Sequence, residues 1–163
     1  MNDYEKQIEN VVKVAIKKFN KKERYLITNQ LHEVCICARL AMYLQRKIKR
    51  TNGFKEYEVD VEYNKGYDGY DDQSKRVAGG LARLDIIVHK RGKIELIGYD
   101  NLICIEMKKE IDTTEYQEDI ERLEILTHPE EGFYYKLGFM IITDLSKRKL
   151  EIKETFIGGN KII

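Results

Sequence analysis

The sequence predicts an α/β fold in which a mixed central sheet is flanked by helices. Segments with apolar residues at helical spacing alternate along the chain with short runs rich in Val, Ile and Tyr. The 163 residues are expected to form one domain, 1–163, because this length can bury a core without disulfides or structural metal. Net charge is +1, which neither requires nor excludes a polyanionic partner.

Two helices are expected before the first strand. Residues 4–19 carry apolar side chains at a spacing of three and four. The second helix is expected over 29–50, with Thr28 or Asn29 as its cap and the sequence TNG at 51–53 as its end.

Three cysteines lie in apolar surroundings. Cys35 and Cys37 belong to two apolar stripes of the second helix, and Cys104 belongs to a strand. We expect all three to be buried, reduced thiols, which are typical of a cytoplasmic protein. The N-terminal segment lacks the apolar core of a signal peptide, and no run is long enough to span a membrane. The expectation is therefore a cytoplasmic protein with no membrane partner.

The rest of the chain has the order expected of one sheet with a crossover helix. The elements are strands at 56–63, 84–90 and 101–108, a helix at 114–127, a strand within 133–144 and an edge strand at 148–153. We expect the first three strands to be consecutive neighbours. A loop rich in Gly and Tyr is expected at 64–80, and a turn with a short strand at 91–100.

Charged residues interrupt two of these strands. Asp85 lies inside LDIIVHK, and NLICIEMK ends in Glu106 and Lys108, which alternation places on one face. If the strands are neighbours, Asp85 and Glu106 meet, and Mg²⁺ or Mn²⁺ would relieve their repulsion. Lys108 would then stabilise charge on phosphorus. The alternative is an ordinary cross-strand ion pair.

This D…ExK pattern resembles the PD-(D/E)xK nuclease superfamily, including its small bacterial and phage members. The resemblance spans about residues 28–145, and Leu84 replaces the proline of the family name, which has no chemical role. It implies a restriction-endonuclease-like core in αβββαβ order after an extra N-terminal helix. It also implies a metal-dependent nuclease in which Asp85, Glu106 and Lys108 are catalytic, and the Met107 backbone carbonyl is a further metal ligand.

The same resemblance implies a glutamate supplied by the helix before the first strand. Glu33 fits that place as a catalytic residue and metal ligand, but an acid there also suits the helix dipole without any other task. Glu62 is a second candidate, or a solvent-facing strand residue. His89 shares the predicted face of Asp85 and is either an assisting group or an exposed strand end.

The expected partner is nucleic acid, with DNA as the first expectation, and a homodimer would suit cleavage of two strands. Basic segments at 13–24 and 46–50 would track phosphates, or they are solvated helix faces. The acidic helix segment 115–124 faces away from the substrate or lines the metal side. Two rival hypotheses remain: an inactive interaction module of the same fold, and a structural charge cluster in an unrelated α/β domain.

Overall fold

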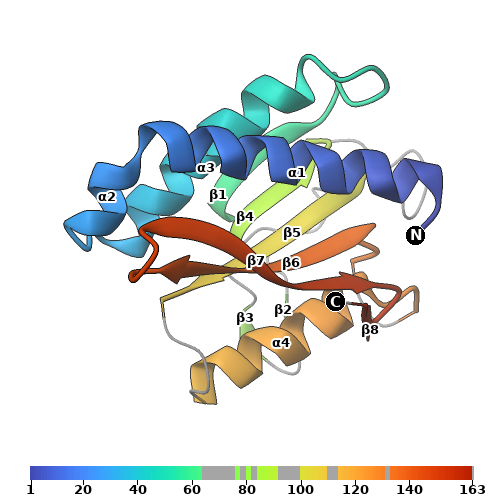
Figure 1. Cartoon of the computed structure of the whole chain (residues 1–163). Helices are drawn as coiled ribbons and strands as arrows, with labels where there is room; N and C mark the ends of the chain where they lie inside the picture. The colour runs from blue at the N-terminus through green and yellow to red at the C-terminus, as the bar shows by residue number, and fades with distance from the viewer. Residues whose placement is uncertain are drawn as a thin grey trace.

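The computed structural model describes residues 1–63, 76–77, 80–81, 84–91, 100–109, 114–130 and 133–162. Three helices come first: α1 (Asp3–Lys22), α2 (Arg24–Thr28) and α3 (Glu33–Ile48). The strands are β1 (Glu58–Tyr63), β2 (Arg76–Val77), β3 (Gly80–Leu81), β4 (Leu84–His89), β5 (Asn101–Lys108), β6 (Leu137–Asp144), β7 (Lys149–Ile157) and β8 (Asn160–Lys161), and helix α4 (Thr114–Thr127) connects β5 to β6. Figure 1 shows α1 and α3 on one side of the sheet and α4 on the other.

The main sheet has six strands in the order β1-β4-β5-β6-β7-β8. Among the described strands, β5 and β6 are the one parallel pair, as expected when a helix crosses between two strands. The other neighbours pair antiparallel. The predicted α/β fold with a mixed sheet is thus confirmed, and so is the prediction that β1, β4 and β5 are consecutive neighbours. The short β2–β3 pair forms a separate sheet.

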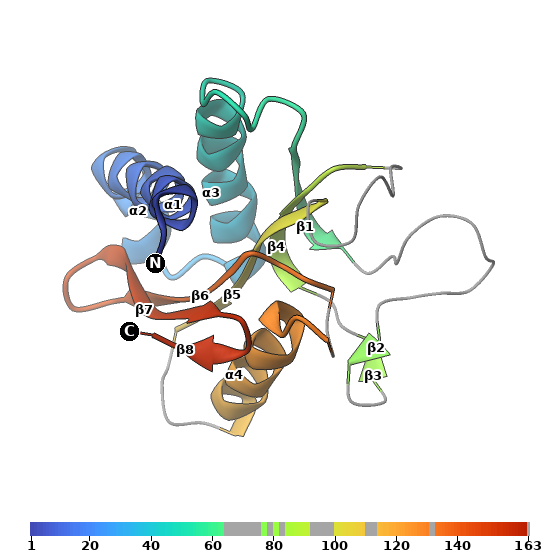
Figure 2. The same ribbon diagram turned by 90° about the vertical axis from the view of Figure 1, so that its right-hand side faces the viewer.

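Each face of the sheet buries its own set of apolar side chains, as strand alternation requires. One face packs against α1 and α3, and its strand residues include Ile86, Val88, Ile103, Ile105, Met107 and Phe139. The other face packs against α4, and its residues include Ile87, Cys104, Met140 and Phe156. Figure 2 shows the sheet between these two helical layers.

The N-terminal helix is fixed at its start and tied to the sheet near its end. Asn2 and Glu5 form a capping box, in which each side chain accepts a hydrogen bond from the other residue's backbone N–H. Near the other end, the Asn20 amide donates to the Leu150 carbonyl at 2.9 Å and its oxygen accepts from the Leu150 N–H at 2.8 Å. This pair of hydrogen bonds sets α1 against β7.

For the second helix, the sequence mispredicts where the helix starts and which of its cysteines are buried. Gln30 has a φ of 51°, in the left-handed region, so the chain breaks after α2 and α3 begins only at Glu33. Cys37 is buried and contacts Met107 of β5, whereas Cys35 is exposed. The prediction that Cys35 is buried fails because the buried face of α3 follows the stripe of Cys37, and the first turns of the other stripe are exposed.

The remaining predictions from the sequence concern the last strand, the segments 64–80 and 91–100, and possible membrane spans. The last strand is longer than predicted: β7 covers Lys149–Ile157, and β8 follows it. Most of the loop predicted at 64–80, and the short strand predicted within 91–100, lie outside the described residues. Among the described residues, no helix combines the length and the apolar character needed to cross a bilayer.

Candidate active site

Asp85 and Glu106 meet on two adjacent buried strands. In the β4–β5 ladder Ile86 pairs with Ile105, and continuing this register by one residue sets Asp85 opposite Glu106. The Asp85 Oδ2 atom accepts a hydrogen bond from the Met107 N–H at 2.7 Å. The two carboxyls lie close enough to affect each other's ionisation, since the charge of Asp85 is among the causes that raise the pKa of Glu106.

Burial and repulsion make both carboxyls poor acids. Desolvation, followed by the charges of Asp85 and Asp119, raises the pKa of Glu106 well above its ordinary value. Desolvation also raises the pKa of Asp85, although the Met107 N–H opposes it. Burial and the neighbouring acids thus favour the neutral form of each carboxyl, and at Glu106 the charge and hydrogen bond of Arg122 oppose this.

Lys108 lies on the same face of β5 as Glu106 and turns toward α4. Its Nζ atom is 3.0 Å from Asp119 Oδ2 and 3.7 Å from Glu115 Oε2. Burial alone would lower the pKa of Lys108, but the hydrogen bond and charge of Asp119 raise it. The ammonium is therefore protonated at neutral pH, which suits charge stabilisation and excludes it as a general base.

Asp119 and Arg122 of α4 complete the network, and the sequence did not single them out. Arg122 Nη1 is 2.6 Å from Glu106 Oε1 and 2.9 Å from Asp119 Oδ1. The sequence contains one indication that Asp119 turns inward. Asp119 lies three residues after Tyr116 and four before Leu123, on the buried stripe of the helix. An acid on such a stripe needs a partner. Asp119 of this helix turns inward, with a side chain that is 6% exposed, whereas the prediction that the acidic segment lines a metal side stays a prediction.

Glu33 stands at the first turn of α3, half-buried. Desolvation and the nearby charge of Asp85 raise its pKa to about 7, against the opposing charges of Lys108 and Lys109. The Lys109 ammonium itself donates to the Leu31 carbonyl at 3.1 Å. Glu33 thus shares the electrostatic surroundings of Asp85. We use the term acid cluster for Glu33, Asp85, Glu106 and Asp119.

Glu62, the alternative candidate, lies in the same row of the sheet. Val61 pairs with Ile86 and Tyr63 with Leu84, so Glu62 falls opposite Asp85. Its φ of 52° interrupts the regular alternation of β1 at this position.

A buried thiol shows how closely these acids gather. Cys37 Sγ lies 3.9 Å from Met107 Sδ, beneath the sheet. Desolvation, and then the charges of Asp85, Glu33, Glu106 and Glu62, raise the pKa of this thiol. Acids from α3, β1, β4 and β5 therefore all lie close enough to this thiol to raise its pKa.

The described residues of the acid cluster do not form a complete metal-binding site. Within the described part of the chain, no three His, Cys, Asp or Glu side chains are placed together to hold an ion. Glu106 Oε1 is held by Arg122 instead. Met107 lies in the β5–β6 ladder opposite Ile141, and ligation by its carbonyl stays a prediction.

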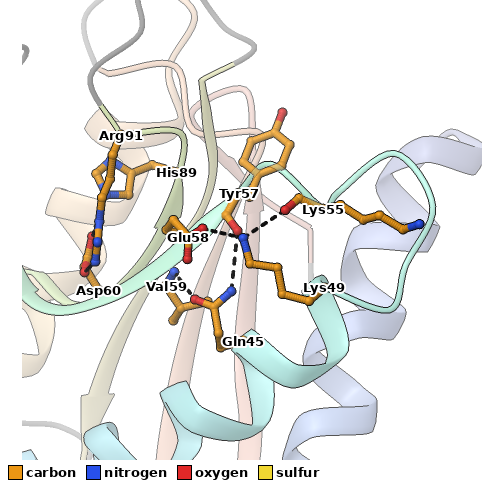
Figure 3. A network of polar contacts seen from close by, with 9 residues as sticks. All are labelled: Gln45, Lys49, Lys55, Tyr57, Glu58, Val59, Asp60, His89 and Arg91. Carbon is orange, nitrogen blue, oxygen red and sulfur yellow. Dashed lines mark hydrogen bonds and ion pairs between the residues drawn. The ribbon is translucent and has the colours of Figure 1, made fainter.

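His89 takes part in a different network, on the edge of the sheet. Its Nε2 atom is 2.8 Å from Asp60 Oδ2, and Arg91 Nε donates to the same oxygen at 2.9 Å. Figure 3 shows these three side chains apart from the contacts that join Gln45 to Val59 and Lys49 to Glu58. The ring nitrogen that the structure shows in contact thus faces Asp60 rather than Asp85.

The first basic segment contributes to an open groove between α1 and β7. This groove of about 610 Å³ is lined by Lys13, Ile16, Lys17, Asn20, Glu151 and Ile152. None of the acid cluster lines it.

Comparison of the chain with protein-family models, with curated proteins and with solved structures finds no match.

Proposed function

We propose that the chain is a divalent-metal-dependent phosphodiesterase that acts on nucleic acid, with DNA as the first substrate to test. The observation that carries the proposal is the pairing of two desolvated carboxyls, Asp85 and Glu106, across adjacent strands beside a protonated lysine. The restriction-endonuclease-like order of the core and the assignment to the PD-(D/E)xK superfamily are part of the same proposal.

The donor set fits a hard divalent cation. The acid cluster supplies four carboxyls, and among the described residues the cations that form ion pairs with its members are Lys108 and Arg122. Burial makes this excess of negative charge costly, and a divalent ion would balance it. Asp85 and Glu106 would hold the ion, with Glu33 and the Met107 carbonyl as further ligands.

The chain's own residues supply orientation and charge. A bound Mg²⁺ or Mn²⁺ would provide Lewis acidity and lower the pKa of a water. Lys108, held by Asp119, would place its positive charge against the phosphoryl oxygens, where negative charge grows as water adds and the ester P–O bond breaks. The lysine keeps its proton throughout, because its raised pKa disfavours proton transfer from it.

One observation favours a second candidate, a non-catalytic module with a structural charge cluster. Arg122 lies 2.6 Å from Glu106 and 2.9 Å from Asp119, so the chain itself supplies a positive charge to both carboxyls without any ion. Under this alternative the chain would bind a partner through another surface and would show no dependence on divalent ions.

A cleavage assay separates the two candidates. The parent, Asp85→Asn and Glu118→Gln are incubated with single- and double-stranded DNA and RNA in Mn²⁺ or Mg²⁺. Glu118 is an exposed acid on α4 and serves as the matched control. We expect cleavage by the parent and by Glu118→Gln, and none above background by Asp85→Asn. Absence of ion-dependent cleavage by the parent on every substrate would refute the proposed function.

A further inference from the structure

Arg122 places one nitrogen between two carboxylates that come from different elements. Its Nη1 atom contacts Glu106 Oε1 of β5 at 2.6 Å and Asp119 Oδ1 of its own helix at 2.9 Å. The side chains of Glu106 and Asp119 are only 3% and 6% exposed, so neither has solvent to replace a lost cation. A buried carboxylate left without its partner is strongly destabilising, whereas exchange of one cation for another is not.

We infer that Arg122 is a tethered cation which occupies the place of the divalent ion, so that metal binding and the Arg122–Glu106 contact exclude one another. This inference rests on the proposed function and adds Arg122 to the site as a positioning residue. Arg122 would hold Glu106 in place in the absence of metal, and its contact with that carboxylate would break when an ion binds.

The geometry provides a way for Arg122 to leave without being lost from the site. Its side chain is 27% exposed, so the guanidinium has a solvent side toward which it moves. Asp119 remains as an anchor on the same helix, three residues away, and its second oxygen holds Lys108. The displaced guanidinium therefore stays beside Lys108, and Asp119 keeps both cations at the site.

The inference predicts competition, which a purely structural ion pair does not. Removing the arginine should tighten metal binding, because the ion no longer has to displace a cation. Coupling between two sites is typically about 5–150-fold, so we expect Mn²⁺ to bind Arg122→Gln about tenfold or more tightly than the parent. If Arg122 were only structural, its loss would lower stability and leave the affinity unchanged or weaker.

The experiment is isothermal titration of Mn²⁺ into the parent, Arg122→Gln, Arg122→Lys and Arg91→Gln. A pH of 8 limits competition from protons, and thermal unfolding with and without Mn²⁺ is recorded for each variant. Arg91 pairs with Asp60 instead of the acid cluster, so its variant controls for loss of an ion-paired arginine. Arg122→Lys keeps the positive charge without the planar guanidinium, and it is the variant to use if Arg122→Gln does not fold. We expect Mn²⁺ to bind Arg122→Lys a few-fold more tightly than the parent.

Tighter binding by the Arg122 variants, with a larger Mn²⁺-induced rise in Tm and no change in Arg91→Gln, supports the inference. Binding by Arg122→Gln alone, with none by the parent, supports it in a stronger form. If the parent binds Mn²⁺ and the Arg122 variants bind equally or more weakly, the inference is overturned and the proposed function stands. If no protein binds Mn²⁺, both are overturned.

Discussion

Replacing Glu33 by glutamine should change how stability depends on pH. The pKa of Glu33 rises from 4.5 to about 7, mainly through desolvation and the charge of Asp85. For an acid with a raised folded-state pKa, the stabilising contribution is complete below the unfolded value and is lost as pH rises through the folded value. The window for Glu33 is therefore pH 4.5 to 7.

The size of the effect follows from the shift. Each pKa unit corresponds to 1.36 kcal/mol, so 2.5 units give an upper bound of about 3.4 kcal/mol. Glu33 is only half-buried, and solvent screening reduces this to about 1–2 kcal/mol. At pH 8 Glu33→Gln should be more stable than the parent by this amount, whereas at pH 5 only about a quarter of the difference, below about 0.5 kcal/mol, should be present.

Urea unfolding at pH 5 and pH 8, with EDTA present, measures the difference, and Glu118→Gln controls for loss of an exposed acid. The competing interpretation makes Glu33 a residue that only stabilises the helix dipole. It predicts the opposite sign at pH 8, a loss of about 0.3–1 kcal/mol in Glu33→Gln. That result would refute the placement of Glu33 among the acids.

Three further predictions follow from the same contacts. Asp85→Asn, which keeps an acceptor for the Met107 N–H, and Glu106→Gln should each lose Mn²⁺ binding in isothermal titration, and unchanged binding in both would remove the metal site. Lys108→Ala should keep Mn²⁺ binding but lose about 10²–10³ in cleavage rate, since it stabilises charge without being a ligand; parental rates would exclude that role. Asn20→Ala breaks two hydrogen bonds to β7 and should lower the free energy of unfolding by about 1–3 kcal/mol in urea, and no loss would show that the tie is dispensable.

Much of the fold was predictable because apolar periodicity and burial agree. The strands LDIIVH and NLICIEMK read as continuous apolar runs, and both are buried centrally in the sheet. Alternation then placed Glu106 and Lys108 on one face, as the structure has them. The start of α3 was not predictable in this way, because it depends on the left-handed backbone of Gln30, which has no clear signature in the sequence.

The site was only partly predictable, because the missing half lies on a helix with many charges. Helix α4 carries acidic or basic residues at six of its fourteen positions, so periodicity alone does not show which of them turn inward. Asp119 and Arg122 enter the site because α4 packs on the β5–β6 face, a tertiary arrangement. The sequence therefore indicated Glu33, Asp85 and Glu106, but not Asp119 or Arg122, the two members supplied by α4.

The central claim is that Asp85 and Glu106 hold a divalent ion. Crystals of the protein soaked in Mn²⁺ and measured at the manganese absorption edge test this most directly, since the anomalous signal locates the ion. We expect one strong peak between the two carboxylates, with the Arg122 guanidinium moved away from Glu106. A map with no peak between them, and with Arg122 still on Glu106, would contradict it.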